Sequence, residues 1–165
     1  MHFILMYIIK MIKNKILTFI FFFIITFSAS LIGGFATLNY KEPWYSLLNK
    51  PIFNPPDWIF APVWTTLYLM MTLAIWLFWH SSNKDIKTIN IYLAQIVINT
   101  TWSIVFFVFH QILFSIFVLI LLIILITILI KKFSNANLIS SYLMIPYLLW
   151  CCFALVLNLS IYLLN

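Results

Sequence analysis

Residues 112–130 read I-L-F-S-I-F-V-L-I-L-L-I-I-L-I-T-I-L-I, nineteen consecutive positions without a charged side chain. A helix rises about 1.5 Å per residue, so a run of this length reaches across a hydrocarbon core of about 30 Å. Lipid offers no hydrogen-bond partner to the backbone, and a crossing segment must therefore satisfy its own amides as a helix. The stretch predicts a transmembrane helix, and its uniformly aliphatic composition favours a lipid-facing position.

Four further apolar runs have the same character, and none contains Asp, Glu, Lys or Arg. They cover residues 16–38, 58–79, 88–109 and 138–164. We therefore predict an all-α protein, an integral membrane bundle of five transmembrane helices. Residues 16–165 form this domain, and residues 1–15 form an N-terminal extension in which Met11 is as sensible a start as Met1.

The composition excludes a water-soluble domain. Hydrophobic residues make up 65% of the chain and charged residues only 7%, with a mean hydropathy of +1.14. Soluble domains are about half apolar and about a quarter charged, so membrane lipid is the expected partner of this surface. The net charge of +6 comes from lysines between the apolar runs, without a basic stripe, and we expect no nucleic-acid partner.

The lysines predict an orientation. With five spans, one side of the membrane receives Lys10, Lys13, Lys15, Lys84, Lys87, Lys131 and Lys132, and the other receives Lys41 and Lys50. The positive-inside rule then places the N-terminus in the cytoplasm and the C-terminus outside. The first run resembles a cleaved signal peptide in its preceding lysines and in Ser28-Ala29-Ser30, but it continues well past that point, which favours a retained helix.

The connection at residues 39–57 is long and contains four prolines, which stiffen it. Trp44, Tyr45 and Phe53 give this loop an apolar side, so it is either a lid over the outer end of the bundle or an anchor at the membrane interface. Asp57 follows two prolines and is expected to cap the second transmembrane helix.

No ionisable residue lies inside a predicted span, which argues against ion-coupled transport. The three acids lie in loops or at a helix start, so no paired-carboxylate chemistry is available. His80 and His110 fall at opposite membrane faces, and we predict no metal site and no obligatory cofactor.

Aromatic and amide side chains form one stripe on each of three predicted helices. The stripes are Trp64, Tyr68, Met71 and Ile75; Gln95, Asn99, Trp102 and Phe106; and Tyr147, Trp150, Ala154, Asn158 and Tyr162. Amides avoid lipid, so the stripes are expected to turn inward. A flat hydrophobic ligand could stack on these aromatic rings, although packing alone also explains such stripes.

Three segments carry a family resemblance. They are W-Y-S-L-L-N-K-P-I-F-N-P-P-D-W-I-F-A-P-V-W-T-T-L-Y-L-M-M at residues 44–71, Q-I-V-I-N-T-T-W-S-I-V-F-F at 95–107 and P-Y-L-L-W-C-C-F-A-L-V-L-N at 146–158. Together they resemble the translocator proteins, the TspO/MBR or tryptophan-rich sensory family, from about residue 11 to residue 165.

The resemblance implies a pocket near the outer loop that binds porphyrins, notably protoporphyrin IX, and other hydrophobic ligands. Trp64 and Trp150 match tryptophans implicated in light-driven porphyrin breakdown, and these two are the candidate catalytic residues. The implied ligand-binding set, with the aromatic stripes included, is Phe60, Ala61, Trp64, Tyr68, Asn99, Trp102, Trp150, Ala154 and Leu157. We expect the porphyrin carboxylates near Lys41, Lys50 or the N-terminus of the second span.

The chain is accordingly expected to be a porphyrin-binding protein of the bacterial cytoplasmic membrane, with a role in transport or stress-linked regulation. A light-dependent porphyrin-degrading enzyme and a passive carrier of a lipophilic molecule remain alternatives. A homodimer is possible, although the third span offers only Ala94 as a small contact residue. Leu159 and Leu163 replace the tyrosine and arginine of the family's sterol motif, so sterol binding through that motif is not expected.

Overall fold

The computed structural model describes residues 14–165. It contains five helices long and apolar enough to cross a membrane. The elements are α2 (Lys15–Tyr40), the short α3 (Trp44–Leu47), α4 (Asp57–Trp79), α5 (Ile86–Ser103) with its π-helical continuation η1 (Ile104–Val108), α6 (Ile112–Ser134) and α7 (Leu138–Leu164). The predicted all-α bundle of five transmembrane helices is confirmed, whereas most of the expected N-terminal extension, including Met11, lies outside the described residues.

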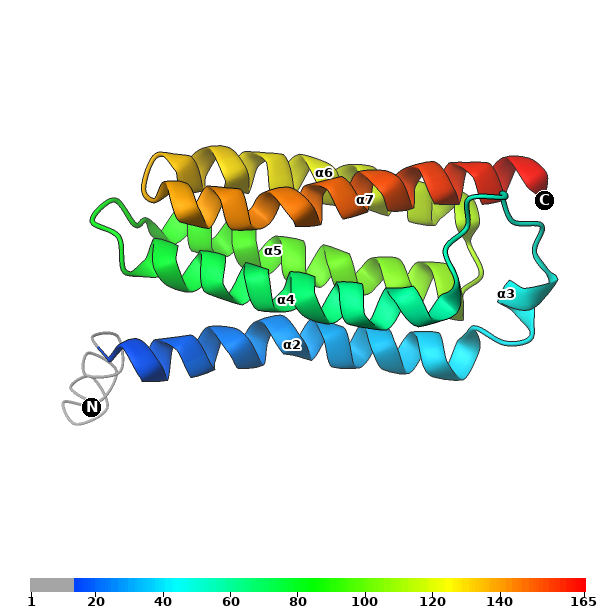
Figure 1. Ribbon diagram of the computed structural model, residues 1–165, viewed down its shortest axis with the longest axis horizontal. Helices are drawn as coiled ribbons and strands as arrows, with labels where there is room; N and C mark the ends of the chain where they lie inside the picture. The colour runs from blue at the N-terminus through cyan, green and yellow to red at the C-terminus, as the bar shows by residue number, and fades with distance from the viewer. Residues whose placement is uncertain (1–13) are drawn as a thin grey trace.

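The five long helices lie side by side along one axis and alternate in direction (Figure 1). One end of the bundle carries α3 and the C-terminus, and we call it the loop end. The opposite end carries Lys15, Lys84, Lys87, Lys131 and Lys132, and we call it the lysine end. The two lysines in the connection between α2 and α4 lie at the loop end, so the lysine asymmetry predicted from the sequence is present along the bundle axis.

Side-chain caps begin three of the helices, all at the lysine end. Asn14 Oδ1 accepts from the backbone amides of Ile16 and Leu17 at 2.9 and 3.2 Å. Asp85 accepts from the Thr88 amide at 2.8 Å, and Asn137 accepts from the Ser140 amide at 3.1 Å. Such caps satisfy backbone donors that have no partner inside the helix.

Asp57 does not cap α4, and this expectation was wrong. It is the first helical residue, and the capping position is Pro56, which makes no side-chain hydrogen bond. Pro56 is extended (φ −56°, ψ 143°), so the proline pair itself ends the loop and the helix begins one residue earlier than predicted. The Asp57 carboxylate is left near the positive end of the helix and pairs with Lys41.

The half of the bundle toward the lysine end is tightly packed. Met71, Ile75 and Phe78 of α4 are fully buried, as are Phe133 of α6 and Met144 of α7. The Phe78 and Phe133 rings are stacked, with centroids 4.8 Å apart. This cluster joins α4, α6 and α7 and forms the solid part of the core.

Helix α6 is exposed on one side and buried on the other, so the lipid-facing position expected for residues 112–130 fits one face of the helix. Phe114 and Phe117 are exposed, whereas Leu119, Leu122 and Ile126 are buried against the neighbouring helices. Hydropathy cannot separate these two faces, because lipid and a helix interface are equally apolar.

Helix α5 ends in a π-helical turn beside the loop end. The Phe109 amide donates to the Ile104 carbonyl at 3.1 Å across this wider turn. It presents both Phe106 and Phe107 to the interior, where they contact the ring of Tyr45 in α3. Two consecutive side chains of a regular helix point about 100° apart, so the π turn helps both rings reach the same interior.

Candidate ligand-binding site

A cavity of about 670 Å³ occupies the half of the bundle toward the loop end. Its wall is built from α2, α4, α5 with η1, and α7, and residues of the connection between α2 and α4 lie at its mouth. The volume is within the range of roughly 300–1,000 Å³ that is typical of small-molecule sites.

Helices α4 and α7 supply two facing parts of the wall. Phe60, Ala61 and Trp64 come from the first two turns of α4, and Trp150, Ala154 and Leu157 come from α7. The rings of Phe60 and Trp150 meet edge to face, 5.9 Å apart, which joins these two parts of the wall. The alanines leave room between the aromatic rings, as a flat guest requires.

A third tryptophan approaches the cavity from α5. Trp102 stacks on Phe106 with centroids 5.6 Å apart and an interplanar angle of 15°. Its indole Nε1 is buried and has no hydrogen-bond partner. A buried donor of this kind is costly to leave unpaired, so it is available to an acceptor on a bound ligand.

Tyr68 closes the inner end of the cavity and connects it to the packed half of the bundle. Its ring stacks on Trp64 at 5.5 Å, and its hydroxyl donates to Asn99 Oδ1 at 2.6 Å. Asn99 in turn donates to the Tyr147 hydroxyl at 2.9 Å, and that hydroxyl donates to Gln95 Oε1 at 3.0 Å. This buried chain of hydrogen bonds holds the three helices α4, α5 and α7 in register.

The predicted ligand-binding residues therefore divide into two groups. Eight of them lie on the cavity wall: Phe60, Ala61, Trp64, Tyr68, Trp102, Trp150, Ala154 and Leu157. Asn99 does not line the cavity but lies one layer behind it, with both of its amide atoms engaged by tyrosines. Its place is that of a positioning residue, because it fixes the hydroxyl of Tyr68.

Sequence reasoning missed the contribution of α2, which forms a whole side of the cavity through Ser30, Gly33, Gly34 and Thr37. A Cβ at Gly33 would lie 3.0 Å from Ser103 Oγ, so glycine is what allows α2 to approach α5 here. A Cβ at Gly34 would meet nothing within 4 Å. The adjacent glycines in an apolar helix were the available signal, since small residues mark close helix contacts in membranes.

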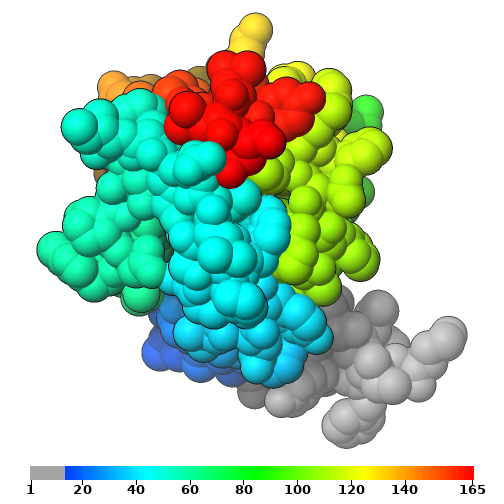
Figure 2. Space-filling view, turned by 90° about the vertical axis from the view of Figure 1, so that its right-hand side faces the viewer, coloured from blue at the N-terminus to red at the C-terminus, as the bar shows by residue number. Residues whose placement is uncertain are grey.

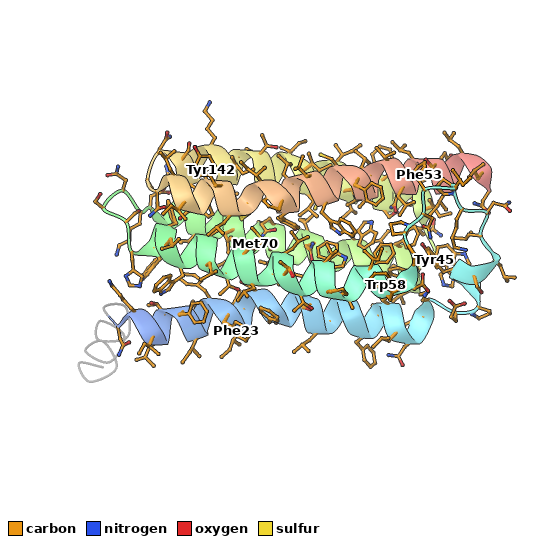
Figure 3. All side chains as sticks on the ribbon, in the orientation of Figure 1. Phe23, Tyr45, Phe53, Trp58, Met70 and Tyr142 are labelled. Atoms are coloured by element: carbon orange, nitrogen blue, oxygen red, sulfur yellow. The ribbon has the colours of Figure 1, made fainter. Side chains whose placement is uncertain are left out.

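The cavity opens sideways between α2 and α4. Leu38 and Trp58 both line it, although 87% and 74% of their surfaces are exposed. Figure 3 places Trp58 on α4 beside α2, at the same end of the bundle as Tyr45 and Phe53. A wall residue that is also largely exposed marks the edge of an opening, and this one lies on the apolar flank of the bundle.

The loop folds over the loop end and forms its cover (Figure 2). Asn49 is fastened to the end of α7: its backbone amide donates to Asn165 Oδ1 at 3.0 Å, and Asn165 Nδ2 donates back to the Asn49 carbonyl at 3.0 Å. Tyr45 is buried beneath this cover, and its phenol donates to Asn54 Oδ1 at 3.1 Å. Of the two arrangements predicted for this loop, the structure has the lid.

Charge is concentrated at the cavity mouth. Lys41, Glu42 and Asp57 all lie on its wall, and Lys41 forms an ion pair with Asp57. Burial, and next the negative charge of Asp57, raise the pKa of Tyr45 to about 12, so this phenol is neutral at physiological pH. The site thus combines an aromatic interior with a charged rim.

The two histidines of the described chain lie apart from the cavity interior and from each other. His80 follows α4 at the lysine end, where its Nε2 lies 2.8 Å from Thr18 Oγ1. Burial, with the charges of Lys84 and Lys15, lowers the pKa of His80. His110 stacks on Trp44 at the loop end, with centroids 4.3 Å apart. Across residues 14–165, no three His, Cys, Asp or Glu side chains come close enough to hold a metal ion.

The fold and the cavity together define a multi-pass helical membrane protein with an internal, aromatic-lined site. The chain belongs to the TspO/MBR family, whose model matches residues 20–164. The resemblance predicted from the three sequence segments is thereby confirmed.

Relatives carry the names of this family across all three domains of life. The chain is 34% identical to "Tryptophan-rich protein TspO" of Archaeoglobus fulgidus over 137 residues, which is 81% of this chain and 87% of the relative. It is 32% identical to "Tryptophan-rich sensory protein" of Cereibacter sphaeroides, covering 75% of this chain and 78% of the relative. It is 29% identical to "Translocator protein" of Bos taurus, covering 77% and 80% of the two chains.

Proposed function

We propose that this protein binds protoporphyrin IX-like tetrapyrroles and other flat hydrophobic molecules in the cavity at the loop end. The observation that carries the proposal is the convergence of Trp64, Trp102 and Trp150, from three different helices, on one cavity of about 670 Å³. Aromatic faces in a water-poor site stabilise a flat conjugated ring by stacking and dispersion. No further cofactor is needed for this binding.

The route of the ligand is part of the proposal. The opening between α2 and α4, edged by Leu38 and Trp58, faces the exposed apolar flank that would contact membrane lipid. A tetrapyrrole dissolved in the bilayer could therefore enter without crossing the lid. With the lysine end in the cytoplasm of a bacterial cell, as the positive-inside rule predicts, the cavity lies toward the outer leaflet of the cytoplasmic membrane.

Titration with protoporphyrin IX in the dark, followed by tryptophan fluorescence of the detergent-purified protein, tests the proposal. We expect saturable quenching in the parent and an affinity about tenfold lower in the variant that carries both Trp64→Phe and Trp150→Phe, because each phenylalanine offers less stacking surface. Trp76→Phe is the matched control, since Trp76 packs on Phe19 and donates to the Lys15 carbonyl, away from the cavity. Equal affinity in the parent and the double variant would count against the proposal.

A second candidate function is light-driven breakdown of the bound porphyrin. It is favoured by the positions of Trp64 and Trp150, whose oxidisable indoles lie on the cavity wall within reach of any guest. Illuminating the complex in the presence of oxygen and following the porphyrin absorption band distinguishes the two functions. Bleaching that depends on Trp64 or Trp150 supports breakdown, and a stable band supports binding alone.

The names of two relatives suggest what such binding could serve. One is called a sensory protein and another a translocator, which match stress-linked regulation and carriage of a lipophilic molecule. Porphyrin flux into vesicles that contain the protein tests carriage. The absence of ionisable residues from the spans makes a passive mechanism the one to expect.

A further inference from the structure

One cation lies on the wall of the cavity. Lys41 follows the last residue of α2. Among the described residues, it is the only lysine on the cavity wall. Its side chain is 21% exposed, so the ammonium group is partly withdrawn from water at the mouth of an otherwise aromatic site. An isolated cation in this position would be poorly solvated and needs an anionic partner.

The protein supplies that partner from the start of α4. Lys41 Nζ is paired with Asp57 and lies 3.6 Å from Glu42 Oε1. The two carboxylates are much more exposed than the lysine, with 61% of the Asp57 side chain and 56% of the Glu42 side chain accessible. The lysine is thus mostly buried at the cavity wall, whereas both of its acidic partners are mostly exposed to solvent.

Such a pair is easily exchanged. Water around a half-exposed carboxylate screens its attraction to an ammonium group, so pairs of this kind contribute little to folding. A carboxylate on a molecule that fills the cavity would approach Lys41 from the side that is shielded from water, where the attraction is stronger. Asp57 can then turn to solvent at little cost, because it is already mostly exposed.

The other lysine at the loop end is not placed for this role. Lys50 Nζ donates to the backbone carbonyls of Ser46 and Leu48, at 3.4 and 3.1 Å, and lies 4.8 Å from the centroid of the Tyr45 ring. Lys50 is absent from the cavity wall. Of the two lysines that the sequence left open for a carboxylate, the geometry therefore selects Lys41.

We propose that Lys41 makes the site selective for ligands that carry a carboxylate, by exchanging its internal partner Asp57 for the acid group of the ligand. The ligand class is amphiphilic acids with a flat hydrophobic body, and tetrapyrrole carboxylic acids belong to it. Neutral esters of the same ring system would fill the cavity but leave Lys41 with Asp57. This inference rests on the proposed function, since it concerns the same cavity.

The test compares two probes of nearly equal shape, protoporphyrin IX and its dimethyl ester, on the purified full-length protein. In the parent we expect the diacid to bind about tenfold more tightly than the ester. Lys41→Met should bring the two affinities within about twofold by weakening only the diacid. Lys50→Met removes the same charge from the same end of the bundle and should leave the preference intact.

Asp57→Asn gives a prediction of the opposite sign. Removing the nearer competitor should strengthen diacid binding about threefold and leave the ester unchanged, because only the more distant Glu42 carboxylate then competes for Lys41. A damaged fold could not produce a gain of affinity for one probe alone. This variant therefore keeps the test decisive even if Lys41→Met were destabilised.

Each outcome has a distinct meaning. A parent that binds both probes equally well, a Lys41→Met variant that keeps the preference, or an Asp57→Asn variant that weakens the diacid would overturn the exchange. In all three cases the proposed binding function would stand. If neither probe binds the parent saturably, the proposed function itself fails, and the role of Lys41 fails with it.

Discussion

Helices α2, α4, α5 and α7 take part in two different interiors, and α6 joins them only in the packed one. Toward the lysine end the side chains are flexible aliphatics and interlocked rings, and Met71, Ile75, Phe78 and Met144 are all fully buried. Toward the loop end, aromatic side chains together with alanines and glycines line a cavity of about 670 Å³. The buried hydrogen bonds from Tyr68 to Gln95 lie between these regions.

The difference suggests that packing and ligand binding are located in different halves of this bundle. Flexible and branched aliphatic side chains fill irregular spaces and give close packing, which in lipid is the main force that holds helices together. Rigid indole rings beside alanine and glycine cannot fill the space between helices, so a hollow remains. Stability should therefore depend on the packed half and ligand affinity on the hollow half, and substitutions can test that division.

The largest expected effect is on stability, from Phe78→Ala. Phe78 is fully buried and stacked on Phe133, so its loss leaves a cavity between α4 and α6. We expect the free energy of unfolding to fall by about 3 kcal/mol, which is at the low end for a buried phenylalanine. The cost is low because helices that have come apart remain surrounded by apolar detergent, so the truncation loses packing contacts rather than hydrophobic transfer energy. Denaturant unfolding in detergent measures this cost.

Phe114→Ala is the control, since Phe114 of α6 is 61% exposed and should cost under about 0.5 kcal/mol. Protein that remains folded after Phe78→Ala should bind porphyrin with unchanged affinity. A large loss of affinity per folded molecule would contradict the division of the bundle into two regions.

An intermediate effect, on binding rather than stability, is expected from Gly34→Leu. Gly34 lines the cavity and a Cβ there would meet no atom within 4 Å, so we expect a leucine to occupy part of the cavity and to lower porphyrin affinity about tenfold. Folding stability should be unchanged or higher, because glycine is a poor helix former.

Gly33→Leu is the matched comparison one residue away. There the new Cβ lies 3.0 Å from Ser103 Oγ, so α2 must move away from α5 and stability should fall by about 1–3 kcal/mol. Thermal unfolding and porphyrin titration of both variants separate the two positions. If both variants changed stability and porphyrin affinity by the same amounts, Gly33 and Gly34 would not have the separate roles of helix contact and cavity wall.

The smallest effect is expected from Asp85→Ala, at the packed end. Asp85 caps α5, and hydrogen bonds from the Thr88 side chain and amide lower its pKa. A lowered folded-state pKa means that the ionised carboxylate favours the folded protein. This contribution is present above the ordinary value of about 3.9 and is lost as the pH falls through the lowered pKa.

Removing the cap should cost about 1 kcal/mol at neutral pH, and the gap between parent and variant should close in acid. Thermal midpoints between pH 3 and pH 7 measure this. Porphyrin affinity at neutral pH should not change, because Asp85 lies at the opposite end from the cavity. A constant gap across this pH range would show that the carboxylate charge plays no part in the cap.

Much of the site was predictable because its residues repeat at helical spacing. Trp64 and Tyr68 lie one turn apart on α4, and Trp150 and Ala154 do the same on α7, and all four line the cavity. The same argument failed for Asn99, which shares a stripe with Trp102 but bonds to two tyrosines behind the wall. A stripe indicates which face of a helix turns inward, not which neighbour each side chain meets.

The sequence by itself determined the number of spans, the family and the span limits to within two residues, except for the end of the fourth span, predicted at 130 and found at Ser134. The last span was predicted at residues 138–164 and is Leu138–Leu164, and the second was predicted at 58–79 and is Asp57–Trp79. The physical reason is local: a segment in lipid must satisfy its own backbone, so a charge-free run of sufficient length suffices to define a helix.

Only the tertiary structure decided that α2 forms a wall of the cavity, that α6 contributes none, and that Lys41 pairs with Asp57 across the mouth. In water, hydropathy separates the buried face of a helix from its exposed face. In a membrane both faces are apolar, so the choice between lipid, neighbouring helix and cavity depends on how the helices pack, which no single stretch of sequence contains.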